Sequence, residues 1–225
     1  MTDPHTRQYS HIGGNPTELL DRLAVSELCK GWPTCRLTLT HTAWSGAQLI
    51  DDFIRISVKG KKIGDFIMHR ECGTLVELNR AANRAVGKMK ATITQRFKHR
   101  DGFEYDVDCD CRFIFFCKKE KVDDDVQDSY GYGHGHRDWR AAFVKLVYEK
   151  DKVVPVDGTS APAFADEVLA RYPTGYKYLG AAQSTLGYDI DAKLVTGQDL
   201  ESCDKMYRSI ESWLAGEQGA VGLFG

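Results

Sequence analysis

The chain between residues 65 and 150 alternates apolar and polar positions with the period of two that is typical of β-strands. Four segments follow this pattern: 65–78, 84–97, 104–118 and 138–150. In the third segment the apolar positions on one side are Tyr105, Val107, Cys109, Cys111, Phe113 and Phe115. The positions between them are charged until Ile114 and Phe116, so we expect one face in the core and the far end covered on both faces. Short turns at 79–83 and 98–102 predict an antiparallel, strongly twisted meander.

Before residue 65 the apolar positions recur at helical spacing. Residues 15–31 are predicted to form a helix that Asn15 caps and that carries an apolar stripe from Leu19 to Leu28. Residues 45–60 open with a capping box and are predicted to form a second helix. Residues 37–44 alternate like a short strand.

Helical spacing returns after residue 158. Residues 162–172 and 200–216 are predicted to be helices, and the latter has a clear amphipathic stripe. Residues 174–196 read as irregular, and the link 119–137 has the composition of a mobile surface loop. The part after residue 158 is too small for a core of its own, so we expect it to pack on the sheet or on a second subunit.

Composition narrows the class of protein. A formal net charge of -2 with both signs mixed along the chain argues against a nucleic-acid surface. No run approaches the length of a membrane-spanning helix, and residues 1–14 read as a flexible tail without the apolar segment of a signal peptide. The seven cysteines lie within apolar patterns, which favours free thiols in a reducing compartment and predicts a cytoplasmic protein.

His69 is the first candidate for chemistry, because it lies within an amphipathic strand. It could act as a general acid or base, or it could be a structural histidine held by one hydrogen bond. Glu71 lies on the same face about 6.6 Å along the strand, where it could orient the imidazole or form a rim carboxylate.

Metal-site patterns are weak. Cys109 and Cys111 share a face and could form a metal corner with Cys72 or His69, but their spacing favours a small apolar pocket wall, and we expect no metal or cofactor. The glycine-rich run around His134 and His136 favours a loop over a metal site. Aromatic residues are numerous enough to line an apolar pocket in a bent sheet, at Trp32, Trp44, Phe113, Phe115, Trp139 and Phe143.

The order of two helices followed by a curved meander resembles the nuclear-transport-factor-2-like superfamily. More closely, the chain resembles SnoaL-like proteins of filamentous fungi, a group similar to scytalone dehydratase. The segments that carry this resemblance are Gly64–Gly73, Arg84–Phe97, Val107–Lys118 and Trp139–Gly158. It implies an α+β fold: a cone-shaped, strongly curved antiparallel sheet over residues 15–158 with N-terminal helices over its concave face, and a C-terminal helical extension at 159–225.

The resemblance also implies an activity. Such a protein would bind a small, mostly apolar polyketide- or terpenoid-like metabolite of secondary metabolism and act as a lyase (dehydratase) or an isomerase/cyclase by cofactor-free acid/base chemistry. His69 matches a catalytic pocket histidine, and the pocket would be shaped by Trp32, Trp44, Cys111, Phe113 and Phe115. In this fold the outer sheet face commonly carries a subunit interface, so a homodimer is expected.

The chain departs from the dehydratase in four respects, and the second pocket histidine of that enzyme is among the features that it lacks. Cys111 and Phe113 stand where that enzyme has polar pocket residues, and a second pocket histidine would fall near Thr94 or Gln95. The stretch 34–37 lacks a Tyr-Asp pair, and the segment 33–44 is about a dozen residues short for this fold. These departures keep open an alternative function, a non-catalytic ligand-binding or dimerisation module with a degenerate active site.

Overall fold

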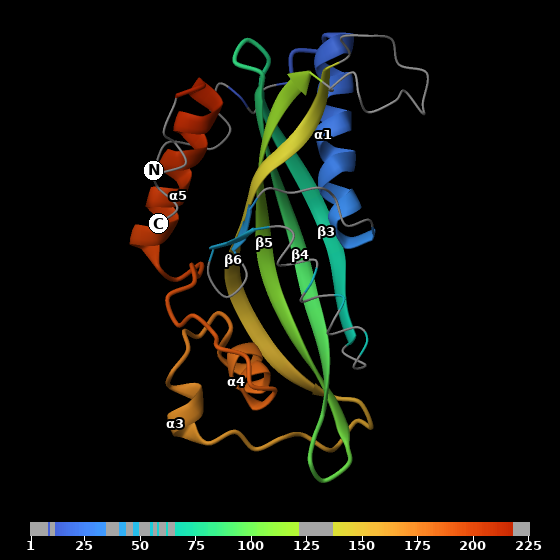
Figure 1. The fold of residues 1–225 in the computed structure, drawn as a ribbon, viewed down its shortest axis with the longest axis vertical. Helices are drawn as coiled ribbons and strands as arrows, with labels where there is room; N and C mark the ends of the chain where they lie inside the picture. The colour runs from blue at the N-terminus through green and yellow to red at the C-terminus, as the bar shows by residue number, and fades with distance from the viewer. Residues whose placement is uncertain are drawn as a thin grey trace.

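The computed structural model describes residues 9, 12–34, 41–43, 47–49, 55, 58, 62, 66–121 and 137–217. It contains a six-stranded sheet with the order β2-β1-β6-β5-β4-β3. The strands are β1 (His41–Ala43), β2 (Ala47–Leu49), β3 (Phe66–Asn79), β4 (Arg84–Lys98), β5 (Glu104–Lys121) and β6 (Arg137–Pro155). The helices are α1 (Pro16–Thr34), α3 (Asp166–Leu169), α4 (Lys177–Thr185) and α5 (Leu200–Ala215). Figure 1 shows the four long strands side by side.

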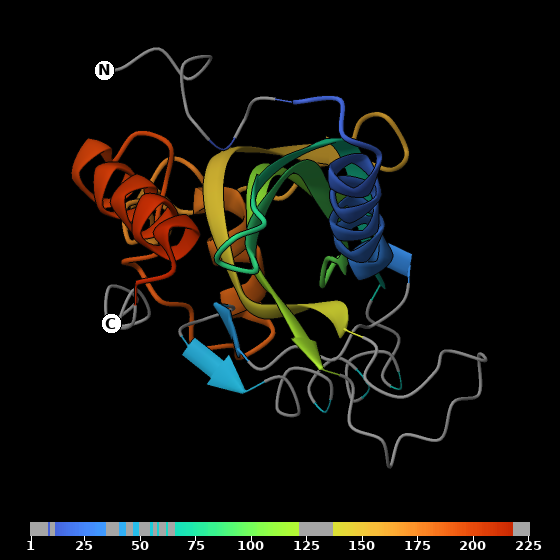
Figure 2. The same ribbon diagram turned by 90° about the horizontal axis from the view of Figure 1, so that it is seen from above.

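The predicted antiparallel meander is confirmed, since each of the strands β3 to β6 pairs antiparallel with the next. The α+β class is confirmed too, and Figure 2 shows that the long strands curl strongly around a common axis. The turn between β3 and β4 marks the upper end of the sheet in Figure 1, and the turn between β4 and β5 marks its lower end. Positive φ angles at Asn83 and Gly102 make these turns possible.

The alternation along β5 separates two buried clusters. The inner cluster lies on one face of the sheet and joins residues such as Ile93 and Phe113 to α1 and α4. The outer cluster lies on the opposite face, where α5 covers Ile114 and Phe116. Figures 1 and 2 show α1 and α5 on opposite sides of the sheet. The expectation that the far end of this strand is covered on both faces is therefore confirmed.

Helix α5 docks firmly on the outer face. Its Trp213 indole N–H donates to the carbonyls of Ala85 (3.1 Å) and Cys117 (3.2 Å), on neighbouring strands. Asp199 caps its first turn by accepting from the Ser202 N–H, and Gly216 ends it with a φ of 82°. The predicted helix over 200–216 is confirmed within a residue at its end, because the stop signal at Gly216 acts on the adjacent backbone.

Helix α1 packs on the sheet through a face other than its predicted apolar stripe. Asn15 caps it as predicted, by accepting from the Thr17 N–H. The apolar stripe, however, stays largely in solvent, since Leu20 is 65% and Leu23 56% exposed. The buried face instead contains Asp21 and Arg22, along with Val25 and Cys29. The charged pair can be buried because the sheet supplies polar partners for both side chains.

Other element predictions were wrong. The capping box at 45–48 overlaps strand β2, although Arg55 and Val58 are helical. Helix α1 continues past residue 31, and the predicted helix at 162–172 contracts to the four residues of α3. The stretch read as irregular contains α4, whose first-turn cap comes from another element and so leaves no local sequence signal. None of the described helices is long and apolar enough to span a membrane.

Candidate functional site

His69 lies on β3 and faces the inner side of the sheet, opposite Ile93 of β4. Its half-buried ring meets the Phe113 ring edge-on, with 5.7 Å between centroids and 76° between planes. Desolvation by the surrounding protein lowers the pKa of His69 to about 4. Within the described residues no hydrogen bond reaches the imidazole. The ring is therefore a neutral base over the ordinary pH range.

Glu71 does not orient this imidazole. Its Oε1 accepts from the Gly73 N–H and the Thr74 hydroxyl, both at 2.9 Å. These bonds close a β-bulge between Glu71 and Thr74, at which Gly73 has a φ of 121°. The interpretation of Glu71 as an exposed rim carboxylate fits this geometry.

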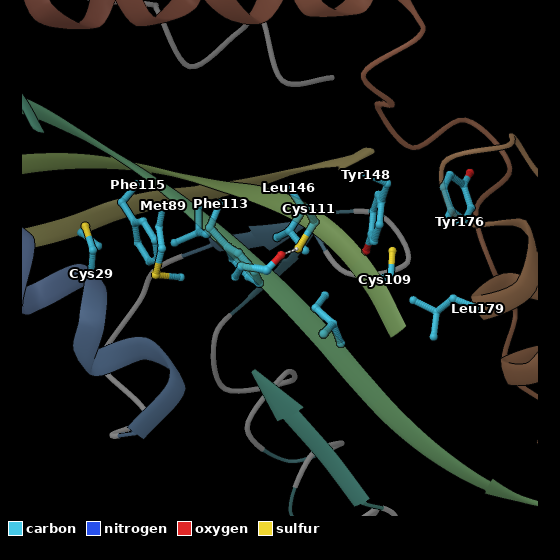
Figure 3. Close-up of a cluster of buried hydrophobic side chains, with 14 of the residues drawn as sticks. Cys29, Met89, Cys109, Cys111, Phe113, Phe115, Leu146, Tyr148, Tyr176 and Leu179 are labelled. Atoms are coloured by element: carbon cyan, nitrogen blue, oxygen red, sulfur yellow. Dashed lines mark hydrogen bonds between the residues drawn. The ribbon is translucent and has the colours of Figure 1, made fainter. Parts of the chain in front are cut away.

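Three of the proposed pocket residues, Cys111, Phe113 and Phe115, lie deep in the inner cluster and are each at most 1% exposed. The two phenyl rings stack with centroids 6.2 Å apart, and the Cys111 thiol donates to the Ala91 carbonyl at 3.5 Å (Figure 3). Trp32 lies in α1, but its side chain and the whole of Trp44 fall outside the described residues. The structure thus places His69 beside Phe113 and tests neither tryptophan.

The cysteine pair on β5 behaves as an apolar wall. The Cys109 thiol donates to the Gly175 carbonyl at 3.6 Å, and burial raises the pKa of both Cys109 and Cys111. Thiols held protonated in this way are poor metal ligands. Among the described residues no group of three metal-ligating side chains converges.

The inner face also carries polar residues that sequence reasoning missed. The cross-strand register places His69, Ile93, Cys109 and Asp151 in one row across β3 to β6. Strand β6 continues five residues beyond the predicted end at 150, and a bulge between Tyr148 and Lys150 shifts its alternation. This shift turns Asp151 to the inner face, where a strict period of two would have placed it on the outer face. Gln183 was missed because α4 was not predicted.

Gln95 takes the inward position that the resemblance assigned to a second histidine. It is 1% exposed, and its Oε1 accepts from Gln183 Nε2 of α4 at 2.8 Å. Thr94, the other candidate for this position, faces outward and donates its hydroxyl to Asp108 at 2.6 Å. A neutral amide pair between β4 and α4 therefore occupies the position where the resemblance led us to expect a titratable histidine.

Asp151 caps a helix, but its carboxylate is only partly satisfied by hydrogen bonds. Its Oδ2 accepts from the Leu179 N–H at 2.8 Å, in the first turn of α4. Its Oδ1 is buried and has no hydrogen-bond partner in the described part of the chain. Desolvation raises the pKa of Asp151 to about 6, although backbone N–H donors and Lys177 oppose the shift.

A hollow of about 530 Å³ spans strands β3 to β6. Most of its lining residues are charged: Arg70, Glu71, Cys72, Thr92, Asp108, Asp110, Lys150, Asp151 and Lys152. Cations pair with the carboxylates, since Lys150 lies 3.4 Å from Asp110 and Arg70 lies 3.7 Å from Asp108. Such compensated, exposed pairs contribute little to stability and favour no apolar ligand.

Comparison with known proteins identifies close fungal relatives. The chain is 38% identical over 221 residues to a PEP2-like protein of Fusarium vanettenii, covering 89% of this chain and 88% of the relative. It is 37% identical over 220 residues to Pea pathogenicity protein 2 of the same organism, with 88% of each chain covered. An uncharacterized protein of Emericella nidulans is 38% identical over 239 residues, with 95% and 94% covered. No family model matches the chain.

Proposed function

The chain belongs to the fungal family that includes Pea pathogenicity protein 2 and PEP2-like proteins, and we propose that it converts a small, mostly apolar metabolite by cofactor-free acid/base chemistry on its inner sheet face. The reaction class is dehydration, isomerisation or cyclisation of a polyketide- or terpenoid-like compound. The curled antiparallel sheet, with α1 and α4 against its inner face, supports assignment to the SnoaL-like cone within the nuclear-transport-factor-2-like superfamily.

One observation carries the proposal: His69 is a neutral, half-buried imidazole at the rim of an apolar cluster. In a dehydration, its unprotonated nitrogen takes a proton from the carbon next to a carbonyl. The imidazolium then returns that proton to the departing hydroxyl, which leaves as water. Phe113 holds one side of the ring dry, so the neutral form is favoured before the reaction and the cation gives up its proton readily.

The rival function, a non-catalytic binding module, has its own support. No described carboxylate or hydroxyl bonds to His69, and Gln95 and Gln183 satisfy each other on the inner face. The argument for a dimer is weaker for such a module, because α5 of the same chain covers the apolar residues of the outer face that a partner subunit would contact.

We also propose a cytoplasmic location, which rests on buried free thiols such as Cys29, Cys109 and Cys117.

Replacing His69 by alanine separates the two functions. We expect His69→Ala to keep ligand affinity within about tenfold while turnover falls about a hundredfold, because only the proton acceptor is lost. A panel of small hydroxylated ketones and terpenoids, screened by mass spectrometry for loss of water or rearrangement, provides the substrate.

The matched control is His99→Ala, which removes a histidine in the turn between β4 and β5. It should leave turnover unchanged. Normal turnover in the His69 variant would show that the catalytic assignment is wrong. Ligands that bind the wild type without being converted would favour the binding module.

A further inference from the structure

We propose that Asp151 and the first turn of α4 form a proton-linked latch over the lower end of the inner face, which tightens in mildly acidic solution and loosens in neutral solution. The latch regulates access to the inner face whatever that face does. Its consequence for His69 rests on the function proposed above.

The contact itself is unusual for a helix start. The N-cap residue of α4 is Tyr176, whose side chain makes no capping bond. The cap comes instead from β6, because the Asp151 carboxylate accepts from Leu179 and also from the Tyr178 backbone. A helix whose orphan N–H groups depend on a distant strand is held to the sheet by that contact.

The helix closes over the inner face. Leu179 and Ala182 belong to the inner cluster, and Gln183, one turn after Leu179, bonds to Gln95 of β4. Figure 3 shows Leu179 and Tyr176 at one end of the row of buried side chains, with Cys29 of α1 at the other. Displacing α4 would therefore uncover Gln95 and also Asp151, which lies in the same row across the sheet as His69.

The two carboxylate oxygens of Asp151 differ in solvation. Oδ2 accepts from the Leu179 N–H, whereas Oδ1 is buried without a partner among the described residues. The ionised form is thus poorly solvated while α4 is docked and becomes hydrated when α4 lifts. Asp199 of α5 is the opposite case, an exposed capping carboxylate whose pKa is lowered by hydrogen bonds from the Ser202 side chain and backbone.

The direction of the pH effect follows from linkage. The docked pKa of Asp151, about 6, lies above its ordinary value of 3.8, so docking and protonation favour each other. The stabilisation of the docked helix by protonation of Asp151 is complete below the ordinary pKa of 3.8 and is lost as pH rises through about 6. Between about pH 7.5 and about pH 5 the two values imply about a tenfold change in the docking equilibrium.

Other groups around Asp151 do not reverse this effect. The positive charge of Lys177, on the first turn of α4, opposes the rise in the pKa of Asp151 without outweighing it. The Cys109 thiol and the Tyr148 hydroxyl stay neutral, because burial raises the pKa of both. Lys150 and Lys152 pair with β5 carboxylates on the outer face. His69 lies in the same row with two strands between it and Asp151, and it stays neutral above about pH 5.

Amide hydrogen exchange of the full chain tests the latch without any ligand. We expect the protection factors of Leu179 and Gln183 to rise about tenfold from about pH 7.5 to about pH 5. In Asp151→Asn, whose side chain keeps an acceptor but no titration, they should be independent of pH. The control Asp199→Asn should weaken protection in α5 alone and keep the pH response of α4.

Protection of α4 that is flat with pH in the wild type, or a pH response that survives in Asp151→Asn, would overturn the latch. Neither result depends on turnover, so failure of the latch and failure of the proposed reaction are distinguishable.

Discussion

Replacing Asp21 by alanine is expected to lower the free energy of unfolding by about 3 kcal/mol, measured by chemical denaturation. Asp21 is 6% exposed at the interface between α1 and the sheet. Its Oδ1 accepts from Lys119 Nζ (2.6 Å) and Trp139 Nε1 (3.0 Å), and its Oδ2 accepts from Arg80 Nε (3.0 Å). Alanine would leave the partly buried Lys119 and the buried indole N–H without their acceptor.

The Asp21 network also predicts a pH dependence. Burial by itself raises the pKa of Asp21, but hydrogen bonds from Lys119 and Trp139 and the charge of Lys119 outweigh it, so the pKa lies below 3.8. The folded chain therefore binds this proton less tightly than the unfolded chain does. The stabilisation is present above about pH 4 and is lost as pH falls through the lowered pKa.

Two variants control the Asp21 experiment. Asp21→Asn keeps an acceptor for Trp139 and should lose less stability than alanine. Asp204→Ala removes a carboxylate from an exposed ion pair on α5 and should change stability by no more than about 0.5 kcal/mol. If Asp21→Ala is as stable as Asp204→Ala, the buried network does not hold α1 on the sheet.

Replacing Gly87 by alanine is expected to destabilise the fold by about 3 kcal/mol, because the added methyl group has no room. A Cβ at Gly87 on β4 would lie 2.2 Å from Cys29 Sγ of α1. Cys29 is fully buried in the inner cluster, so relieving the overlap requires either its side chain to rotate into closely packed neighbours or α1 to move.

Removing the obstructing sulfur should rescue the variant. In Cys29→Ala the nearest remaining side-chain atoms lie 3.7 Å from the new Cβ, an ordinary contact distance. Adding Gly87→Ala to Cys29→Ala should therefore cost at least about 1.5 kcal/mol less than adding it to the wild type. Gly197→Ala is the matched control, since its Cβ would meet atoms only at 3.6 Å or beyond. Equal costs in both backgrounds would show that this sulfur does not set the helix-to-sheet distance.

The long strands could be read from the sequence almost residue by residue. The alternation along 104–118 reflects a strand with a different environment on each face, because apolar side chains face the core and charged side chains face away from it. The helix at 200–216 was predicted equally well, since its amphipathic stripe and the stop at Gly216 are both local features of the sequence. The inward position of His69 was expected from the register of the family resemblance, and the pairing of His69 with Ile93 agrees with it.

Helices α1 and α4 show where this reasoning ends. The leucine stripe of α1 favours its burial, yet Asp21 is buried instead because Lys119, Trp139 and Arg80 gather around it from three other parts of the chain. Helix α4 contains Gly180 and lacks a local cap, and it is held by contacts from β4 and β6.

The sequence by itself determined the four-strand meander and the side of the third long strand that faces the core, because these depend on periodicity and on signals between neighbouring residues. Only the tertiary structure decided which face of α1 is buried, that α4 exists, and that Gln95 and Asp151 lie beneath it. Those outcomes depend on polar groups that meet across 28 to 118 residues of chain, and no local pattern records such a meeting.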